Sequence, residues 1–502
     1  MAHAGRVRWP TGPRTVFFDD TAGSTTLSKA VREGRIRRLA PKIYTADMVS
    51  EPAEVVLENR WRILAKLLPK AVIVDRSAAE GGRISNGTLF VAAQTQRKRV
   101  LLPGLEVRIR PGSAIDTPIA DSPWPEGLRM ASAARTLLDN LASTRGRRGH
   151  VPRTLSHAEL EDWLAGKAIA WGRERTARLR AECHELAEVF RGDHDAERVD
   201  ALFDQLQGLE PPRRDAGEMF TAFTTGTAWD DRRIKLFESV GDALMSLPSE
   251  VPRRLPVSDA LGELPFYESY FSNYIEGTEF TIEEARAIIE TQVPPADRPE
   301  DGHDILGSYH CVVDPVGRAA TSTDPDELIG YLQVRHQTIL AGRADKTPGE
   351  WKSKPNQVGA YVFVAPQLVE GTLRKGLAGL ERLEPGIARA LYVMLVVSEV
   401  HPFTDGNGRV ARVMMNAETS AVGDARIVIP SVYRNEYISA LRRVSTSNGD
   451  IGAYVAVMVH AWRWTAAMPW TDRAATEGQL DATNALLDST DAQNNNIRLT
   501  LP

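Results

Sequence analysis

The residues best suited to chemistry lie in one short stretch, 401–412, which reads His-Pro-Phe-Thr-Asp-Gly-Asn-Gly-Arg-Val-Ala-Arg. His401 is the group here whose unperturbed pKa lies near neutrality, so it could take a proton from an incoming hydroxyl. The amides of Gly406, Asn407 and Gly408 can point together where a helix starts, and such amides form an anion site. Glycine also lets the backbone approach a phosphate closely.

Charged side chains complete this stretch. Arg409 and Arg412 are three residues apart, on one face of a helix, and each offers a planar cationic fork for phosphate oxygens. Asp405 supplies a hard oxygen ligand that suits a magnesium ion. A lone histidine before proline is usually structural, and Gly-x-Gly is usually a turn. Together and in this order, however, these residues indicate a nucleotidyl or phosphoryl transfer site.

The flanking sequence predicts how this stretch is held. Residues 387–400 are almost wholly apolar, without internal glycine or proline, which predicts a buried helix. Pro402 and the two glycines then break that helix into a tight loop. A second helix is expected from Arg409 onward. The site should therefore be a helix, a glycine-rich turn and a helix.

The stretch resembles the signature of the Fic family, His-x-Phe-x-Asp/Glu-Gly-Asn-Gly-Arg-x-x-Arg, and matches it at every defined position. The resemblance implies transfer of AMP from ATP, with Mg²⁺, to a hydroxyl side chain of a target protein. It implies that His401 is the general base, that Phe403 packs into the core and that Asp405 holds the metal. The remaining implied roles concern the phosphates: Asn407 with the glycine amides for the alpha and beta phosphates, Arg409 for the beta phosphate and Arg412 for the gamma phosphate.

A second signal lies upstream, where residues 265–277 predict a helix ended by Gly277. Ser272 and Glu276 are four residues apart and share a face. This pattern resembles the inhibitory motif of the Fic family, Ser/Thr-x-x-x-Glu-Gly/Asn. By that resemblance Glu276 pairs with Arg412 and occupies the arginine that the gamma phosphate needs. The alternative is an ordinary exposed glutamate near a helix end.

Two further features are weaker. Residues 356–364 alternate in an extended pattern, and the resemblance implies a β-hairpin flap there, with Gly359, Ala360 and Tyr361, that aligns the target by strand pairing. The alternative is a plain hairpin. Tyr437 could stack near adenine, although a core tyrosine is an equal alternative.

Length and composition limit the possible domain organisation, compartment and partners. A chain of 502 residues should hold two to four domains. Two cysteines, Cys183 and Cys311, support neither a disulfide framework nor a zinc site. No signal peptide or membrane span is expected, so the cytoplasm is the expected compartment. Residues 1–110 hold 20 Lys/Arg against 10 Asp/Glu, whereas the whole chain has a net charge of -5, so the two parts should have different partners.

The basic N-terminal region predicts a short helix from Ser24 and then a hairpin over residues 35–45. That order is the layout of a winged helix, with basic side chains facing DNA phosphates: Arg35, Arg37, Arg38 and Lys42. The region loosely resembles the abortive-infection type antitoxins and regulators. The alternative is a basic surface on a small packing domain.

The expected fold is a mainly α catalytic Fic domain with a small β-hairpin flap, behind an N-terminal α+β winged-helix-like region. The expected domains follow in order: a winged-helix-like DNA-binding domain at 1–70, an α+β antitoxin-like domain at 71–190, a helical connecting region at 191–260, the Fic domain at 261–470 with its inhibitory helix at 265–277, and a flexible tail at 471–502. Expected partners are ATP, an unidentified target protein, DNA and a second copy in a homodimer, but no membrane.

Three functions are weighed. The first is a protein adenylyltransferase inhibited by its own Glu276. The second is a DNA-binding transcriptional regulator whose Fic domain senses nucleotide. The third keeps the fold but removes AMP or transfers another phosphate-linked group.

Overall fold

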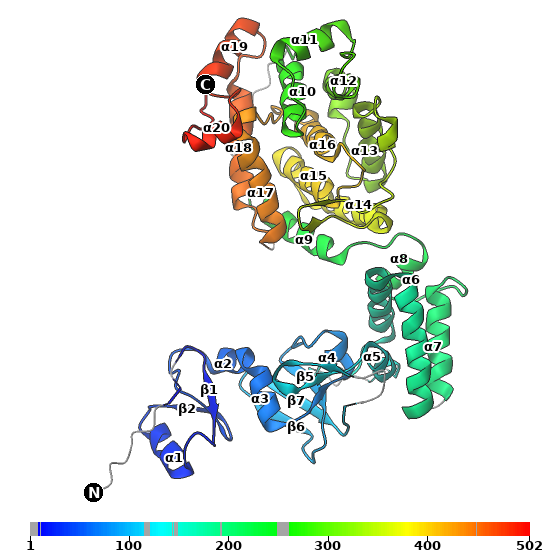
Figure 1. Cartoon of the computed structure of the whole chain (residues 1–502), viewed down its shortest axis with the longest axis vertical. Helices are drawn as coiled ribbons and strands as arrows, with labels where there is room; N and C mark the ends of the chain where they lie inside the picture. Colours follow the sequence, from blue (N-terminus) through cyan, green and yellow to red (C-terminus); the bar gives the residue numbers. More distant parts are fainter. Residues whose placement is uncertain are drawn as a thin grey trace. The chain divides into compact units, whose positions relative to one another are not determined.

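The computed structural model describes residues 9–10, 12–114, 121–142, 144, 149–190, 193–247, 261–447 and 449–502. The chain divides into two compact units, Met1–Thr225 and Gly226–Pro502, which are described separately (Figure 1). Within the described residues, no helix combines the length and apolar character needed to cross a bilayer.

The N-terminal unit contains two sheets. The first has the order β1-β3-β2 and is antiparallel, with β1 at Val16–Phe18, β2 at Arg37–Ala40 and β3 at Ile43–Thr45. The second is mixed and has the order β6-β7-β5-β4-β9-β8. Its strands are β4 (Val72–Ile73), β5 (Thr88–Ala92), β6 (Arg99–Leu102), β7 (Leu105–Arg110), β8 (Ser122–Pro123) and β9 (Arg129–Met130).

Helices accompany these sheets and then form a bundle. The helices of this unit are α1 (Ser24–Arg32), α2 (Pro52–Glu58), α3 (Arg60–Leu67), α4 (Asp75–Ala79), α5 (Ala133–Asn140), α6 (His157–Phe190), α7 (Asp193–Leu206) and α8 (Glu218–Thr224). Apolar side chains of α2 and α3 pack with the strands in one core, and those of α5 to α8 form a second core. This second core includes Leu137, Leu164, Phe203 and Phe220, all of them buried.

The short helix and the basic hairpin expected in the N-terminal region are confirmed as α1 and β2–β3. Most of the hairpin's cations, however, have partners inside the unit. Arg35 bonds Glu33, Arg37 donates to the carbonyls of Ser50 and Met48, and Lys42 lies 3.3 Å from Asp19. The winged-helix assignment and its DNA contacts stay a prediction.

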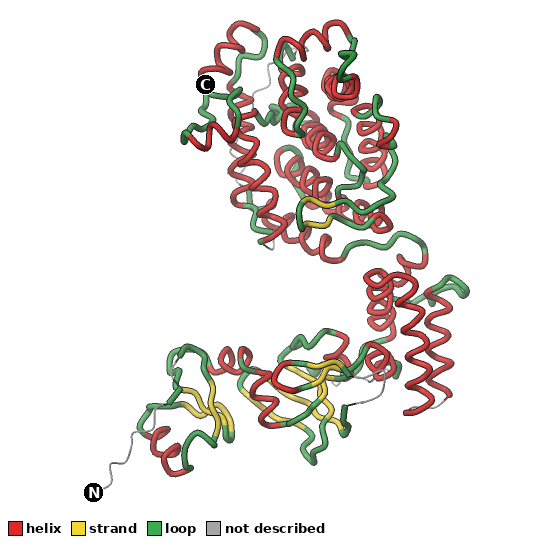
Figure 2. Tube along the Cα trace, in the orientation of Figure 1, coloured by secondary structure: helices red, strands yellow, loops and turns green. Residues whose placement is uncertain are grey.

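The C-terminal unit is helical, apart from one hairpin that is the only strand pair among its described residues (Figure 2). The hairpin consists of β10 (Gln357–Val358) and β11 (Tyr361–Val362). The helices are α9 (Asp231–Leu244), α10 (Leu264–Ile275), α11 (Ile282–Thr291), α12 (Pro299–Val313), α13 (Pro325–Ile339), α14 (Val369–Leu377), α15 (Ile387–Val400), α16 (Asn407–Ala421), α17 (Arg434–Thr446), α18 (Gly452–Ala467), α19 (Arg473–Ala482) and α20 (Ser489–Asn494). The prediction of a mainly α domain with a small hairpin is confirmed.

Helices α15 and α16 form the centre of this unit and pack against each other (Figure 1). Nearly every side chain of α15 is buried, as its apolar sequence predicts. A buried ion pair joins α10 to the same centre: Arg426 donates to both oxygens of Glu268 at 2.6 and 2.7 Å. Asn416 of α16 also donates to Glu268, at 2.9 Å. Because breaking such a pair would leave a buried charge, α10 is held firmly against α16.

The connecting region expected at 191–260 is divided differently in the structure. Helices α7 and α8 pack with α6 in the N-terminal unit, whereas α9 packs against α14 and α15 in the C-terminal unit. Residues 191–192 and 248–260 lie outside the described residues. The expected region is therefore not one element, because its apolar faces belong to two separate cores.

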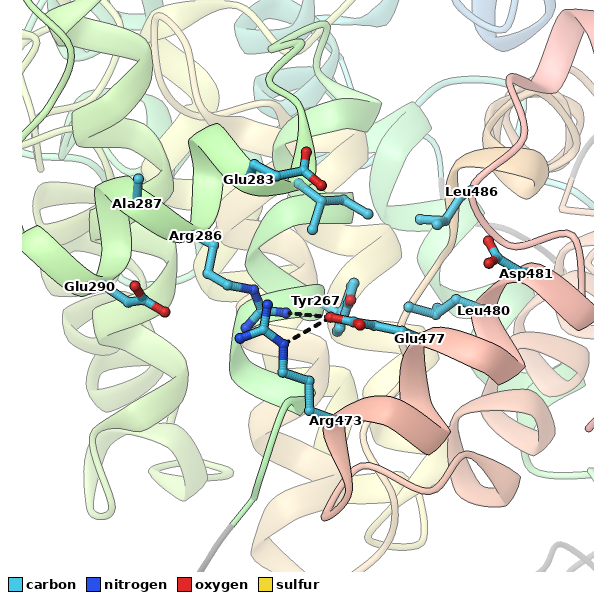
Figure 3. Close-up of a pocket in the computed structure, with 11 residues that line it drawn as sticks. Tyr267, Glu283, Arg286, Ala287, Glu290, Arg473, Glu477, Leu480, Asp481 and Leu486 are labelled. Atoms are coloured by element: carbon cyan, nitrogen blue, oxygen red, sulfur yellow. Dashed lines mark hydrogen bonds and ion pairs between the residues drawn. The ribbon is translucent and has the colours of Figure 1, made fainter.

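The flexible tail expected at 471–502 is also wrong, because these residues form α19 and α20 and fill part of the core. Leu480, Ala485, Ala492 and Leu499 are buried against α10, α11 and α18. Helix α19 faces α10 and α11 across a cavity of about 540 Å³. Figure 3 shows Arg286 of α11 and Arg473 both directed at Glu477 of α19, at 3.6 and 2.9 Å. The prediction failed because the segment is polar overall, although its few apolar residues are spaced so that they pack in the core.

This packing predicts the effect of shortening one leucine. We expect Leu480→Ala to lower the free energy of unfolding by about 2–5 kcal/mol, because the substitution opens a cavity in the core. Leu480 is fully buried, whereas Leu487 in the same segment is 39% exposed. The matched change Leu487→Ala should alter the free energy by no more than about 0.5 kcal/mol. Denaturant unfolding measures both, and equal small effects would mean that this segment does not pack.

Candidate active site

The loop between α15 and α16 has the backbone that the sequence predicts. Helix α15 ends at His401, whose φ of 52° is left-handed, and Pro402 follows. Helix α16 begins after Gly406, whose φ is 72°. A side chain on Gly406 would also lie 3.0 Å from Leu340. A left-handed histidine costs some free energy, so the surrounding contacts must impose this conformation.

Three side chains hold the loop in this conformation: Asn407, His336 and Phe403. Asn407 accepts a hydrogen bond from the amide of Phe403 and donates to the carbonyl of the same residue, both at 2.9 Å. His336 of α13 stacks on the Phe403 ring at 3.6 Å and bonds the carbonyl of Asp405 at 3.0 Å. Its other ring nitrogen accepts from the amide of Gly349, so the ring is neutral, and burial lowers the pKa of His336 to about 4. Phe403 itself is fully buried, as expected.

Lys352 supports the same loop through hydrogen bonds of its ammonium group. Its ammonium donates to the carbonyls of His401 (2.7 Å) and Val400 (3.3 Å) and to the side chain of Asn356 (2.7 Å). These carbonyls end α15, where a cation is favourable. Burial lowers the pKa of Lys352 to about 7. Sequence reasoning missed both Lys352 and His336, because neither lies in a motif; their spacing gives no signal before the fold is known.

His401 is positioned to act as a base. Its ring stacks on Phe363, with the ring centres 3.8 Å apart. Its Nδ1 lies 3.3 Å from the carbonyl of Ser398, and because a carbonyl can only accept, Nδ1 carries the hydrogen and Nε2 keeps its lone pair. Burial lowers the pKa of His401 to about 4, so the imidazole is neutral at physiological pH.

A carboxylate lies against the amino end of α16, where the sequence predicts an anion site. A Cβ added to Gly408 would lie 2.1 Å from Oε1 of Glu276. The lack of a side chain at this position therefore leaves room for a negatively charged group beside the first turn of the helix. That turn carries the positive end of the helix dipole and amides without partners in the helix.

Glu276 reaches this place from the end of α10 and contacts Arg412. Helix α10 ends beside Glu276, and Gly277 turns the chain away with a φ of 91°. One Nη of Arg412 donates to Glu276 at 2.8 Å and to the carbonyl of Ser272, also at 2.8 Å. The Nε of Arg412 donates to the hydroxyl of Ser272 at 3.0 Å. Both residues of the predicted inhibitory motif thus bond the buried guanidinium, although Glu276 does so through one oxygen.

Three residues expected to bind nucleotide have other contacts. Arg409 is buried, and its guanidinium bonds Asp304 and Asn273 rather than sharing a surface with Arg412. Asn407 uses its side chain on Phe403. Tyr437 is 2% exposed and contacts Arg412, which places it in the core instead of beside an adenine ring. These side chains hold α16 in this structure, and their contacts with a nucleotide stay a prediction.

The hairpin at the expected flap is confirmed, and its underside is anchored. Gly359 has a φ of 60°, and Ala360 is exposed at the tip. The Tyr361 hydroxyl donates to Glu399 at 2.5 Å. Arg233 of α9 forms an ion pair with Glu399 at 3.2 Å and donates to the carbonyl of Val362 at 2.9 Å. Because Glu399 precedes His401 by two residues, these contacts join the hairpin to the end of α15.

Asp405 is suited to hold a metal ion carried by a nucleotide. Its side chain is 42% exposed, and its Oδ1 accepts from the amide of Gly406 at 2.7 Å and lies 3.7 Å from the guanidinium of Arg409. No cluster of three metal-binding side chains occurs in the described part of the chain. One exposed carboxylate beside an anion site fits Mg²⁺, which keeps several waters and takes other ligands from phosphates.

Comparison with known proteins agrees with this geometry. Residues 329–418 match the model of the Fic/DOC family. A protein adenylyltransferase Fic from Nematostella vectensis is 25% identical over 357 residues, which cover 65% of this chain and 81% of that protein. One from Drosophila persimilis is 27% identical over 237 residues, covering 45% of this chain and 44% of the fly protein.

The chain thus spans less than half the length of the fly relative. A solved structure of Fic-1 from C. elegans is 20% identical, covers 64% of this chain and 97% of that chain, and superposes with a TM-score of 0.35. The family model covers His401, the glycine-rich loop and both arginines in one continuous match. Residues 329–418 of this chain therefore match the Fic domain of the Fic/DOC family.

Proposed function

We propose that the chain is a protein adenylyltransferase, which moves AMP from ATP to a hydroxyl side chain of a target protein, and that Glu276 inhibits it. The observation that carries this proposal is the contact of Glu276 with Arg412 at the mouth of α16. A helix mouth that binds a carboxylate next to a buried guanidinium will also bind a phosphate. The relatives named protein adenylyltransferase support the same chemistry.

The proposed transfer uses groups that the site already holds. Nε2 of His401 takes the proton of the target hydroxyl, and the hydroxyl oxygen forms a bond to the alpha phosphorus of ATP. The bond from that phosphorus to the bridging oxygen breaks, and pyrophosphate leaves with the electron pair. The amides of α16 and Arg412 stabilise the charge that develops on the phosphates. Mg²⁺, held beside Asp405, would supply further positive charge to the pyrophosphate.

Inhibition follows from competition for one guanidinium. Arg412 is 5% exposed and donates to Ser272 and Glu276, so a gamma phosphate can reach it only if Glu276 moves away. A phosphate placed beside the fixed carboxylate would also be repelled. ATP bound in the presence of Glu276 would therefore be held with its alpha phosphate out of line for attack.

The flap is proposed to bind the target. An extended segment can add to a short two-stranded hairpin through main-chain hydrogen bonds. The exposed side chains of Val358 and Val362 offer apolar contacts to such a segment. The link from Tyr361 through Glu399 to the end of α15 would then hold the acceptor hydroxyl in register with His401. We place this activity in the cytoplasm, where ATP and magnesium are abundant.

An alternative reaction is removal of AMP from a modified protein. One observation favours it: the carboxylate of Glu276 lies against Gly408, at the start of the helix that follows the His401 loop. A carboxylate there could orient a water molecule toward a phosphate. The intact mass of a modified target, measured before and after incubation with the wild-type enzyme, separates the two reactions. Removal lowers the mass of the target by that of one AMP group.

The first prediction concerns Glu276. We expect Glu276→Gly to raise labelling of cell proteins by labelled ATP with magnesium on the order of tenfold to a hundredfold, the equivalent of one buried charged hydrogen bond. Adding His401→Ala to that variant should abolish labelling. Glu279→Gly is the matched control, because Glu279 is exposed and has no recorded contact with Arg412. Equal labelling by wild type and by the variants at positions 276 and 401 would refute the assignment.

The second prediction concerns pH. His401 acts as a base only when neutral, and its pKa of about 4 keeps it neutral as pH falls toward 5. Labelling by the Glu276→Gly enzyme should therefore be nearly constant between pH 7.5 and 5.5. Phe363→Ala uncovers the imidazole, so its pKa should return toward about 6.5, and the rate should fall about tenfold over the same interval. Initial labelling rates at low ATP concentration measure this, and an acid decline in the parent enzyme would contradict it.

A further inference from the structure

The N-terminal unit contains a groove of about 490 Å³ on the sheet face formed by β5, β7 and the edge strand β6. Its apolar lining includes Phe90, Val151 and Pro152. Its remaining polar lining is mainly cationic: Lys98, Arg99, Arg108, Arg110 and Arg153. Figure 1 shows the three strands side by side. None of these residues takes part in the Fic site.

The outer cations of this groove have no side-chain partners in the described part of the chain. Arg97, Lys98 and Arg99 follow one another in the turn before and at the start of β6, and all three are exposed. Within the described residues, none of their side chains has a recorded hydrogen bond or ion pair. Three consecutive free cations next to a groove create a positive surface longer than the groove itself.

Strand pairing brings further positive charge to the same face. In the antiparallel pairing of β6 with β7, Arg99 lies directly opposite Arg108. Like charges at opposite positions destabilise a sheet, so the fold alone does not favour this pair. An anion bound between the two guanidinium groups would reverse that cost.

The inner cations are held in place by a buried carboxylate. Asp75 is 1% exposed and has a left-handed φ of 54°, an unusual conformation for a residue other than glycine. It bonds Arg110 at 3.2 Å and Arg153 at 2.9 Å. Arg108 is held in turn by Glu106 at 3.3 Å and by His150 at 2.8 Å. The groove therefore presents guanidinium groups in fixed positions, beside a turn whose cations are free.

We propose that this groove and its adjoining turn bind the phosphate backbone of a nucleic acid. A single small anion would cover only the recessed arginines, whereas a chain of phosphates can pass from the groove onto residues 97–99. A flat membrane surface could reach the turn but not the recessed groups. The half-buried Val151 and Pro152 add apolar contact area for sugars or bases. The hairpin at residues 35–45 offers no run of free cations like that at residues 97–99, because Arg35, Arg37 and Lys42 have partners within the described residues.

The test uses the full chain with a short mixed-sequence DNA duplex and the corresponding RNA duplex, each followed by fluorescence anisotropy over a series of salt concentrations. For B-DNA, each phosphate contact adds about 0.9 to the slope of log affinity against log salt. The variant R97Q/K98Q/R99Q removes three contacts, so its slope should fall by about 2.7, and its affinity at low salt should fall with it.

The matched control is R35Q/R38Q/K42Q, which removes the same charge from three exposed positions of the hairpin. We expect it to leave affinity and slope within twofold of the parent. The lysine variant R97K/R99K, which keeps the charge, should retain the parental slope. Thermal melting of each variant checks that the unit stays folded.

Binding of either duplex with this pattern supports the proposal, and the two duplexes show whether DNA or RNA is preferred. The proposal is overturned if neither duplex binds, if both glutamine variants lose affinity equally, or if the hairpin variant alone does. It is equally overturned if anionic vesicles or inorganic phosphate compete as well as the duplexes do. None of these measurements depends on AMP transfer. Failure of the nucleic-acid proposal would therefore leave the proposed enzyme activity unaffected.

Discussion

A permanently charged guanidinium lies buried in the C-terminal unit, and the structure depends on how its charge is balanced. Arg412 cannot lose its proton, and water barely reaches it. Such a group is stable only beside hydrogen-bond acceptors and negative charge. In this structure Ser272 and Glu276 supply them. During the proposed reaction a phosphate would do so, which means that the inhibited and the active forms satisfy the same requirement with different anions.

The loop that carries His401 shows a related division of labour. Its strained backbone is fixed by His336, Lys352 and Asn407. The side chains that face the proposed substrate do not have to hold the loop in place. The neutral state of His401 comes from burial under Phe363 rather than from a charged partner. Precision at the site is thus provided by packing and hydrogen bonds that lie behind it, which is what preorganised catalysis requires.

The sequence predicted the features that belong to a motif and missed those that do not. The apolar run of α15, the glycines of the loop and the pairing of Glu276 with Arg412 are set by residues that carry a pattern. The partners of Arg409 carry no such pattern, because Asp304 and Asn273 belong to neither motif. The burial of Tyr437, the support by Lys352 and the packing of α19 and α20 likewise depend on tertiary contacts. Polar composition suggested a tail, although four buried apolar side chains suffice to attach that segment.

The lack of a side chain at Gly408 affects both the proposed inhibition by Glu276 and the proposed phosphate site. Gly408 leaves a small space at the helix mouth, and the carboxylate of Glu276 occupies it. A larger residue there would exclude that carboxylate, but it would equally exclude a phosphate. On the proposed mechanism, a substitution at Gly408 would therefore disturb both the inhibitory contact and the phosphate site, and an adjustment of basal activity would have to act on the helix that carries Glu276.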